Sequence, residues 1–400
     1  MITNSYILAS EFCDSVRDGT HDTPKQTNSG YRLVTSKHIK NGQINSEEGY
    51  FISEKDFCKI NERSLVEQWD ILMSMIGTIG EAAIVKEQPN YAIKNVALFK
   101  CGDEQKAKWL YYYLCSPDGR GQLFGNQKGS SQQFVSLTQL RNLQIPVQDC
   151  FIMKKITDIL SVYDDLIENN QKQIKLLEEA TMRLYKEWFV HLRFPGHETT
   201  KIVDGVPEGW EIATVKDMGK VITGKTPSTA KTDNYGNDIP FVKIPDMHGV
   251  VYPLKTEIKL SKKGADIQKN KYLPPKSIMV SCIATVGLVC IAFDRCQTNQ
   301  QINSIVLNDE DNLYYLFFVM KEIKSLLEGV GSNGATMTNV NKTKFENIKL
   351  LFPDETVIKK FNVFAEPIFD YILNISKQNE QLIEARDKLL PKLMSGEIEV

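Results

Sequence analysis

The chain carries one sequence pattern twice, and this repeat constrains its fold more than any other feature. Gly19 matches Gly224 at a displacement of 205 residues, and the run Ile71–Gly80 matches Ile278–Gly287 at 207. Other matches fall between displacements of 205 and 208 within the 400 residues, so the period hardly drifts. A period of this length predicts two copies of one folding unit rather than one continuous core.

Each copy consists of a globular segment followed by a helical one. Residues 1–150 and 200–353 alternate short β-rich runs with Gly, Pro and Asn breaks, whereas residues 151–192 and 354–400 are nearly free of both Gly and Pro. We therefore expect an α+β fold with two mixed α/β globules. Two long helices would separate the globules, and a pseudo-two-fold axis would relate the copies.

Composition excludes several classes of protein. Hydrophobic residues make up 42% of the chain and charged residues 24%, which is typical of globular proteins and not of disordered ones. No apolar run reaches 18 residues and the N-terminus lacks the segments of a secretory signal, so we expect neither a membrane span nor export. The eight cysteines form no C-x-x-C pair, which favours reduced thiols in the cytoplasm over a zinc site or a disulfide framework.

The net charge of −2 argues against a strongly basic nucleic-acid binder only as an average. Residues 201–353 contain 19 Lys and Arg against 16 Asp and Glu, while residues 1–150 contain 16 against 17. The helical segments carry the remaining acidic excess, so the total charge does not exclude DNA binding by the globules. The first globule would need a local basic face or the help of a partner.

The helical segments carry heptad stripes. In the first segment, mostly apolar residues recur in alternating steps of four and three from Ile156 to Trp188, and a displacement of 205 gives a second stripe from Phe361 to Leu393. A helix of this length spans roughly 50 Å. Two related modules spaced by more than one DNA turn (~34 Å) match the geometry of a protein that reads a bipartite site.

One Asn in each stripe sets the expected register of the helix pair. In the repeat, Asn170 corresponds to Ile375, and Asn379 corresponds to Ile174. A parallel, in-register pair of helices would therefore place each Asn against an Ile. An antiparallel pair brings the two amides together, which satisfies both. We predict this intramolecular antiparallel coiled coil; the alternative is that each helix packs only on its own globule. The same register pairs Ile167 with Leu382, Ile174 with Ile375, Leu177 with Ile372, Ile156 with Leu393 and Trp188 with Phe361.

Two short motifs suggest enzymatic sites. Gly219–Thr226 fits the P-loop expression G-x-x-x-x-G-K-[ST], but Pro227 and a polar stretch follow where a P-loop requires an apolar helix, so we do not expect nucleotide binding. Asp246, Glu257 and Lys259 resemble the P-D…E-x-K pattern of Mg²⁺-dependent nucleases, and this leaves a self-contained endonuclease as the alternative function. The five histidines form no H-E-x-x-H motif and no close Cys/His cluster, so we expect no metal site.

Polar and cationic loops are the candidates for DNA contact, because Gly permits close approach while Ser, Thr, Asn, Gln and Lys offer donors to phosphates and base edges. The segments Ile76–Gly80 and Ile283–Gly287 read instead as mostly core, with small residues that serve close packing. The candidate contact residues are Thr20, His21, Lys25, Lys37, Lys128, Ser130, Gln132, Lys225, Thr226, Ser228, Lys243, Asn299, Gln300, Ser332 and Asn333.

Taken together, these features resemble the specificity subunit of type I restriction–modification systems. The resemblance covers essentially the whole chain, although residues 1–12 lack the Pro-Glu-Gly-Trp opening that Val206–Trp210 shows, which leaves the start of the first domain open. Its motifs are the Thr-Pro loop at Gly224–Pro227, the Gly-Thr-Ile-Gly and Ala-Thr-Val-Gly segments, Thr298–Gln300, Trp188–Phe189 with Phe194–Gly196, and the closing Leu389–Glu397.

The resemblance implies a non-catalytic DNA reader. Residues 1–150 and 200–353 would be target-recognition domains, each reading one half of a split DNA site. Residues 151–192 and 354–400 would form the coiled coil that sets the spacer and docks two methyltransferase subunits, which the motor–nuclease subunits join. Methyl donor and ATP would belong to those partners, so no cofactor is expected here. The family's target domains vary, so base-reading residues are not carried over individually.

Overall fold

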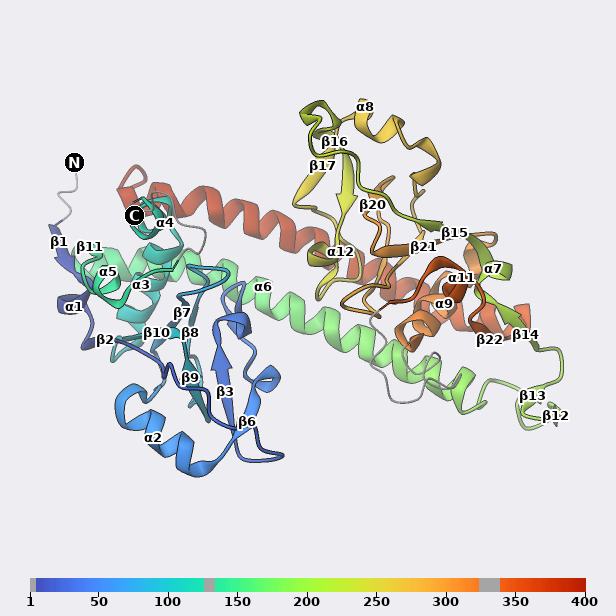
Figure 1. Cartoon of the computed structure of the whole chain (residues 1–400), viewed down its shortest axis with the longest axis horizontal. Coiled ribbons are helices and arrows are strands. Elements are labelled where there is room, and N and C mark those ends of the chain that lie inside the picture. Colours follow the sequence, from blue (N-terminus) through green and yellow to red (C-terminus); the bar gives the residue numbers. More distant parts are fainter. Residues whose placement is uncertain (1–4, 126–133, 324–338) are drawn as a thin grey trace. The chain divides into compact units, whose positions relative to one another are not determined.

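The computed structural model describes residues 5–125, 134–323 and 339–400, and the chain divides into two compact units (Figure 1). The first unit comprises residues 1–166 and 382–400, and the second comprises residues 167–381. Two long helices, α6 (Cys150–Tyr185) and α12 (Glu355–Ser395), contribute one part to each unit. Each unit therefore contains one globule packed on a segment of both helices.

The globule of the first unit is built on four small sheets with strand orders β2-β10-β7-β8, β6-β3-β9, β1-β11 and β4-β5. Strand β3 pairs parallel with β9 and antiparallel with β6. The elements are β1 (Ser5–Leu8), α1 (Ala9–Phe12), β2 (Ser15–Asp18), β3 (Tyr31–Thr35), β4 (Ile39–Lys40), β5 (Gln43–Ile44), β6 (Tyr50–Ile52), α2 (Glu54–Ser64), β7 (Ile71–Ser74), β8 (Ala82–Ile84), β9 (Tyr91–Lys94), β10 (Val96–Lys100), α3 (Glu104–Cys115), α4 (Pro117–Phe124), α5 (Leu137–Arg141) and β11 (Gln144–Val147).

The second unit repeats this topology with strand orders β15-β21-β18-β19, β17-β16-β20 and β14-β22. Here β16 pairs parallel with β20 and antiparallel with β17, as β3 does with β9 and β6. The elements are β12 (Ile202–Val203), β13 (Val206–Pro207), β14 (Glu211–Thr214), α7 (Val215–Met218), β15 (Gly219–Thr223), β16 (Tyr235–Val242), β17 (Ile258–Leu260), α8 (Lys262–Asp266), β18 (Ile278–Ser281), β19 (Val289–Ile291), β20 (Gln297–Thr298), β21 (Ile302–Leu307), α9 (Leu313–Lys321), α11 (Lys342–Glu346) and β22 (Lys349–Phe352).

Backbone conformation repeats as well as topology. Left-handed residues recur at equivalent places, although for non-glycine residues this conformation is uncommon and costs energy. Because the same strained turns occur before and after the same central strand, the two globules are copies of one fold. The equivalent pairs are Trp69 (φ 70°) with Lys276 (φ 64°), Gly77 (φ 74°) with Ala284 (φ 63°), and Gly80 (φ 84°) with Gly287 (φ 94°).

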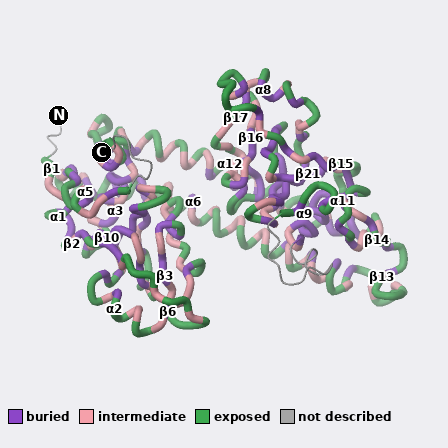
Figure 2. The backbone as a smooth tube through the Cα atoms, viewed as in Figure 1, coloured by how far each residue is buried: buried purple, intermediate pink, exposed green. Residues whose placement is uncertain are grey.

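Both units bury their apolar residues between sheets and helices (Figure 2). In the first unit, Trp109 of α3 is fully buried and its indole N–H donates to the Pro146 carbonyl at 2.8 Å. In the second, Phe318 of α9 packs edge-to-face on Phe369 of α12, with ring centroids 5.8 Å apart. Aromatic pairs of this geometry stabilise beyond their buried area. No helix in the described part of the chain is long and apolar enough to cross a bilayer.

The helices α6 and α12 pack antiparallel within the second unit. Asn170 Nδ2 donates to Asn379 Oδ1 at 2.9 Å, which is the pairing that their offset in the sequence predicts. Toward the other end of the segment, Trp188 lies against Phe361 with ring centroids 5.9 Å apart. An early residue of one helix thus meets a late residue of the other, so the expected antiparallel coiled coil is present.

In the first unit, an ion pair joins the remaining parts of the two helices. Arg386 Nη1 of α12 donates to Asp164 Oδ1 of α6 at 2.6 Å, and the Tyr112 hydroxyl of α3 donates to Asp164 Oδ2 at 2.7 Å. Ile156 and Leu393 belong to one buried cluster, again in the predicted register. The polar triad fixes both helices and the globule to one another.

Candidate nucleic-acid interface

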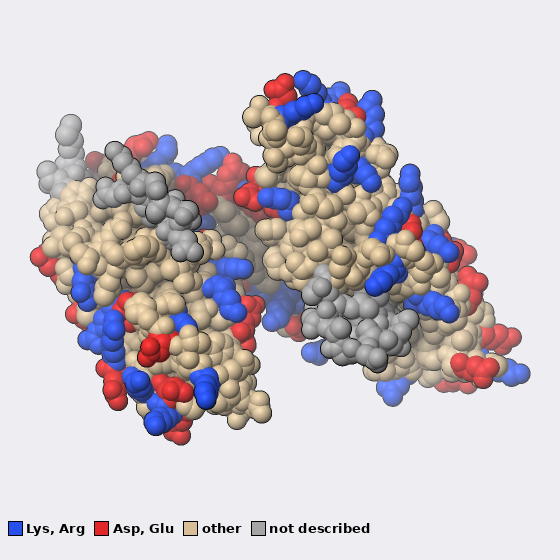
Figure 3. Space-filling model, viewed as in Figure 1, with Lys and Arg blue, Asp and Glu red and all other residues tan. Residues whose placement is uncertain are grey.

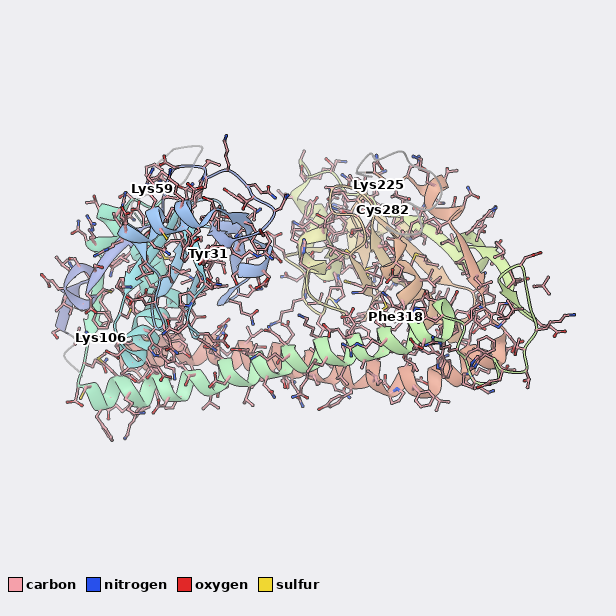
Figure 4. The ribbon with its side chains drawn as sticks, turned by 90° about the horizontal axis from the view of Figure 1, so that it is seen from below. Tyr31, Lys59, Lys106, Lys225, Cys282 and Phe318 are labelled. Carbon is pink, nitrogen blue, oxygen red and sulfur yellow. The ribbon has the colours of Figure 1, made fainter. Side chains whose placement is uncertain are left out.

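In each unit, at least one lysine lies on the side of the globule away from the long helices. Figure 4 places Lys59 of the first unit and Lys225 of the second unit at this far edge, whereas Phe318 lies next to the helices. Figure 3 shows Lys and Arg side chains along the face of the second unit that carries β15 and α11. The helix pair anchors each globule, so the opposite edge is the one left for a ligand.

The loop after β15 brings three of the predicted residues together. Gly224 packs so closely on the segment after β20 that a Cβ there would lie 2.2 Å from the Asn299 carbonyl oxygen. Lys225 N–H donates to the Thr298 carbonyl at 2.9 Å, and the Thr226 hydroxyl donates to Gln300 Oε1 at 2.7 Å. Lys225 is exposed, so a rigid loop presents a cation beside a glutamine amide. These groups suit a phosphate and a base edge.

This geometry is not that of a P-loop, although Gly219–Thr226 matches the expression. Gly219–Thr223 is strand β15, and the chain after Thr226 reaches strand β16 through a mostly exposed segment and a single 3-10 turn, Thr232–Asn234, with no α-helix at the Lys-Thr pair. A P-loop requires a helix N-terminus at the Lys-Thr pair to hold the phosphates. The geometry of Gly219–Thr226 therefore agrees with the prediction that this segment does not bind nucleotide as a P-loop does.

The corresponding loop of the first unit borders a hollow of about 530 Å³ between residues 20–25 and helix α2. Three predicted residues, Thr20, His21 and Lys25, line this hollow. Sequence reasoning missed Lys59 and Arg63, which line it from α2. Their spacing of four residues, which places two cations on one face of a helix, was the available signal.

Acidic and amide groups restrain the cations of the first unit. Arg63 forms an ion pair with Asp18, whose side chain is only 7% exposed. His21 Nε2 lies 3.0 Å from Asp18 Oδ2, and His21 Nδ1 lies 2.8 Å from Asn95 Oδ1. The positive charge available to an anionic ligand is therefore smaller here than the count of basic residues suggests.

Two of the three nuclease-like residues, Asp246 and Glu257, have structural roles. Asp246 accepts the backbone N–H of Lys243 at 2.7 Å and of Glu257 at 2.9 Å, so it caps a short 3-10 helix, Ile244–Met247. Its counterpart His38 does the same in the first unit, where Nδ1 accepts the Thr35 N–H at 2.9 Å. Because both carboxylate oxygens of Asp246 already accept backbone N–H groups, this geometry does not favour the endonuclease alternative.

Lys243 is less available than the sequence suggested. Its ammonium group forms an ion pair with Glu257 at 2.8 Å, and this hydrogen bond lowers the pKa of the Glu257 carboxyl. The pair ties the capped 3-10 helix to the segment before β17. A phosphate would have to compete with this carboxylate for Lys243.

The remaining candidates differ in accessibility. Lys37 and Ser228 are exposed. Asn299 is buried, and its amide bonds to Gln301 at 3.0 Å, so in this conformation it shapes the loop rather than facing outward. The candidates that fall outside the described residues are Lys128, Ser130, Gln132, Ser332 and Asn333.

The two small-residue segments are not core throughout, which corrects the sequence-based expectation. Ile76, Gly77 and Thr78 are exposed, and a Cβ on Gly77 would meet no atom within 4 Å. Ala284 and Thr285 are exposed in the equivalent turn. The left-handed backbone, rather than close packing, explains the small residues at the turn tips.

With this geometry in place, comparison with known proteins assigns the family. The sequence profile of the type I restriction modification DNA specificity domain matches residues 10–179 and again residues 207–385. The chain belongs to the family of type I restriction–modification specificity subunits. The two matches coincide with the two copies of the repeat, and each spans one globule and most of its helical segment.

Individual specificity subunits resemble the chain over most of its length. The HindI specificity subunit of Haemophilus influenzae is 34% identical over 325 residues, which cover 66% of this chain and 71% of that protein. The putative MjaX specificity subunit of Methanocaldococcus jannaschii is 26% identical over 98% of this chain and 92% of its own. The crystal structure of an S subunit from M. genitalium, 13% identical, shares the fold with a TM-score of 0.52 and covers 98% of this chain and 96% of its own.

Proposed function

We propose that this chain is the sequence-specific DNA-recognition subunit of a type I restriction–modification complex, acting in the cytoplasm without catalysis of its own. Residues 1–150 and 200–353 are the target-recognition domains, and each reads one half of a bipartite DNA site. The coiled coil of residues 151–192 and 354–400 sets the spacer between the halves. The observation that carries the proposal is the duplicated globule with polar and cationic loops at the edge opposite its helices, in a chain of this family.

Methyltransferase subunits would dock on the helices. Among the described residues of α6 and α12, exposed apolar side chains recur at equivalent places: Ile159 (38% exposed) and Leu166 (46%) in the first unit, and Phe364 (52%) and Tyr371 (50%) in the second. Each pair is separated by seven residues, and a displacement of 205 converts one pair into the other. Exposed apolar stripes of this kind mark protein–protein contacts, and two equal stripes fit two copies of one partner.

In this proposal, the partners supply the chemistry. The methyl donor binds to the methyltransferase subunits, and ATP binds to the motor–nuclease subunits that join them. This chain contributes the choice of DNA site.

Methylome mapping of host DNA with and without the chain tests the proposed function. We expect one bipartite methylated motif to disappear when the gene is deleted and to return on complementation. An unchanged methylome in a host that still expresses the methyltransferase would contradict the proposal. As a separate check, the purified chain with Mg²⁺ should not cleave DNA, and cleavage abolished by Asp246→Ala would establish the endonuclease instead.

The docking stripes allow a matched test, because each copy serves as the control for the other. Ile159→Asp and Phe364→Asp should each reduce the assembly from two methyltransferase copies to one in native mass spectrometry, and the double variant should bind none. Unchanged assembly in the double variant would place the partner elsewhere on the chain.

A further inference from the structure

Two lysines of the second unit are held together by one buried glutamine. Gln268 is 6% exposed, and its Nε2 donates to the Lys225 carbonyl at 2.7 Å. The backbone carbonyl of Gln268 accepts the backbone N–H of Lys271 at 2.8 Å. Gln268 also donates to Gln297 Oε1 at 2.8 Å, and Gln297 is fully buried. The loop of Lys225 and the turn of Lys271 therefore have one fixed spacing.

A second buried amide connects this loop to the start of α11. The Thr223 hydroxyl donates to Asn303 Oδ1 at 2.6 Å, and Asn303 Nδ2 donates to the Val340 carbonyl at 3.2 Å. Thr223 precedes Lys225 by two residues, and Val340 precedes Lys342 by two. Asn303 is 2% exposed, so the connection is part of the core. Three segments distant in sequence thus each present a lysine from one rigid scaffold.

Lys271 lies close enough to Lys225 and Lys342 for their charges to act on it. Burial lowers the pKa of Lys271, and the positive charges of Lys342 and Lys225 lower it further. Within the described residues, neither Lys225 nor Lys271 forms an ion pair, while Lys342 pairs with Glu346 at 3.3 Å. Like charges held together without a full complement of acids are stabilised by a bound anion.

The first unit lacks this cluster at the equivalent places. Thr20 stands where the second unit has Lys225, and Leu137 stands where it has Lys342. Arg63 occupies the place of Lys271, but Asp18 neutralises it. The equivalent positions therefore carry three lysines in the second unit and a single, neutralised arginine in the first.

We propose that Lys225, Lys271 and Lys342 form a binding site for DNA backbone phosphate in the second unit. The inference rests on the proposed function, since it identifies where one target-recognition domain holds the DNA backbone. Phosphate contacts fix position and contribute salt-dependent affinity, whereas base contacts select the sequence. The site therefore sets affinity and register rather than the identity of the target.

The test measures how DNA binding by the chain, assembled with its methyltransferase subunits, depends on salt. The probe is a labelled duplex that contains the motif found by methylome mapping, titrated between 50 and 200 mM KCl. Each lost phosphate contact should reduce the slope of log K against log salt by about 0.9. For Lys225→Gln with Lys271→Gln, the affinity lost between these salt concentrations should be about 12-fold smaller than for the wild type. Lys342→Gln should add only a smaller reduction of the slope, because Glu346 already offsets part of its charge.

A matched control comes from the same unit. Lys263 and Lys276 are already paired with Asp233 and Glu310, so Lys263→Gln with Lys276→Gln removes the same charge and should leave the slope nearly unchanged. Arg at positions 225 and 271 should retain the wild-type slope, because it keeps the charge. Equal slope changes in the test and control pairs would overturn the inference.

Discrimination between motif and scrambled duplex separates this inference from the proposed function. A wild-type assembly that does not discriminate would refute the function itself. An assembly that discriminates, but whose Lys225→Gln, Lys271→Gln variant keeps the wild-type slope, would refute only the phosphate site. Circular dichroism of each variant checks that the fold is retained.

Discussion

The Asn170–Asn379 pair makes a quantitative prediction about the coiled coil. Asn379 is 7% exposed, whereas Asn170 is only half-buried. Asn170→Ile removes the donor to the buried amide and should cost about 1–3 kcal/mol. Asn379→Ile leaves an amide that water still reaches, so we expect about 0–1 kcal/mol. The double variant replaces both amides by an apolar pair and should lie within about 1 kcal/mol of the wild type.

Hydrogen-exchange mass spectrometry provides the assay, because it reads local opening without assuming that both units unfold together. Peptides covering residues 167–181 and 372–381 should exchange about 5- to 150-fold faster in Asn170→Ile, since 1.4 kcal/mol corresponds to a factor of ten. Asn169 is exposed on the same helix, so Asn169→Ile is the control. Its effect should stay within roughly 0.5 kcal/mol.

Coupling between the two asparagines requires that their effects on stability are not additive. If the effects of the two single variants simply add in the double variant, the amides are not coupled and the hydrogen bond does not set the register. Faster exchange in Asn379→Ile than in Asn170→Ile would contradict the assigned order of burial. Either result would leave only the apolar stripe to hold the helices in place.

Further predictions concern the helices and the thiols. Cysteines at the two asparagine positions should form a disulfide after Cys58 and Cys150, the exposed native thiols, are replaced by Ser; a bond from position 379 to Ile174→Cys instead would refute the register. Arg386→Met should destabilise the first unit by about 2–4 kcal/mol, because it leaves a partly buried carboxylate without its cation, whereas Lys154→Met on the helix surface should cost less than about 1 kcal/mol in thermal unfolding. Native alkylation followed by mass spectrometry should label Cys58 and Cys150 before the other cysteines. Burial raises the pKa of several thiols and one phenol in the folded state, so their contribution to stability is present below pH 9 and is lost as the pH rises toward 11–12; the urea midpoint should fall over this range. These groups are Cys115 and Cys282, with a pKa of about 11, and Cys290, Cys296 and Tyr113, with a pKa of about 12.

The repeat and the coiled coil could be predicted from sequence because their signals are local or periodic. A heptad stripe needs only its own helix to be recognised, and one displacement maps it onto the second copy. The two asparagines then left one arrangement that satisfies both amides. Sheet order could not be obtained in this way, since the parallel pairing of β3 with β9 joins strands that are separated by 55 residues in sequence.

The candidate site was only partly predictable, because its residues meet through tertiary contacts. Lys225, Thr226 and Gln300 were identified from loop composition, and the structure brings them together. Lys271 and Lys342 lie in short helices that carry no binding motif, and only buried amides place them near the loop. The nuclease-like motif misled for a related reason: an Asp three residues after the start of a turn is also the pattern of a capping residue.

The polar contacts of the helix pair favour the intramolecular arrangement over pairing with a second copy of the chain. In the repeat, Asn379 corresponds to Ile174 and Arg386 corresponds to Thr181. If the α6 helix of another copy replaced α12 in the same register, Asn170 would face Ile174, and Asp164 would lose its cation. A half-buried amide and a partly buried carboxylate that lose their partners each cost free energy, and the carboxylate costs more because water still reaches the amide. Both units therefore favour α12 as the partner of α6, although the apolar stripes alone would accept either helix.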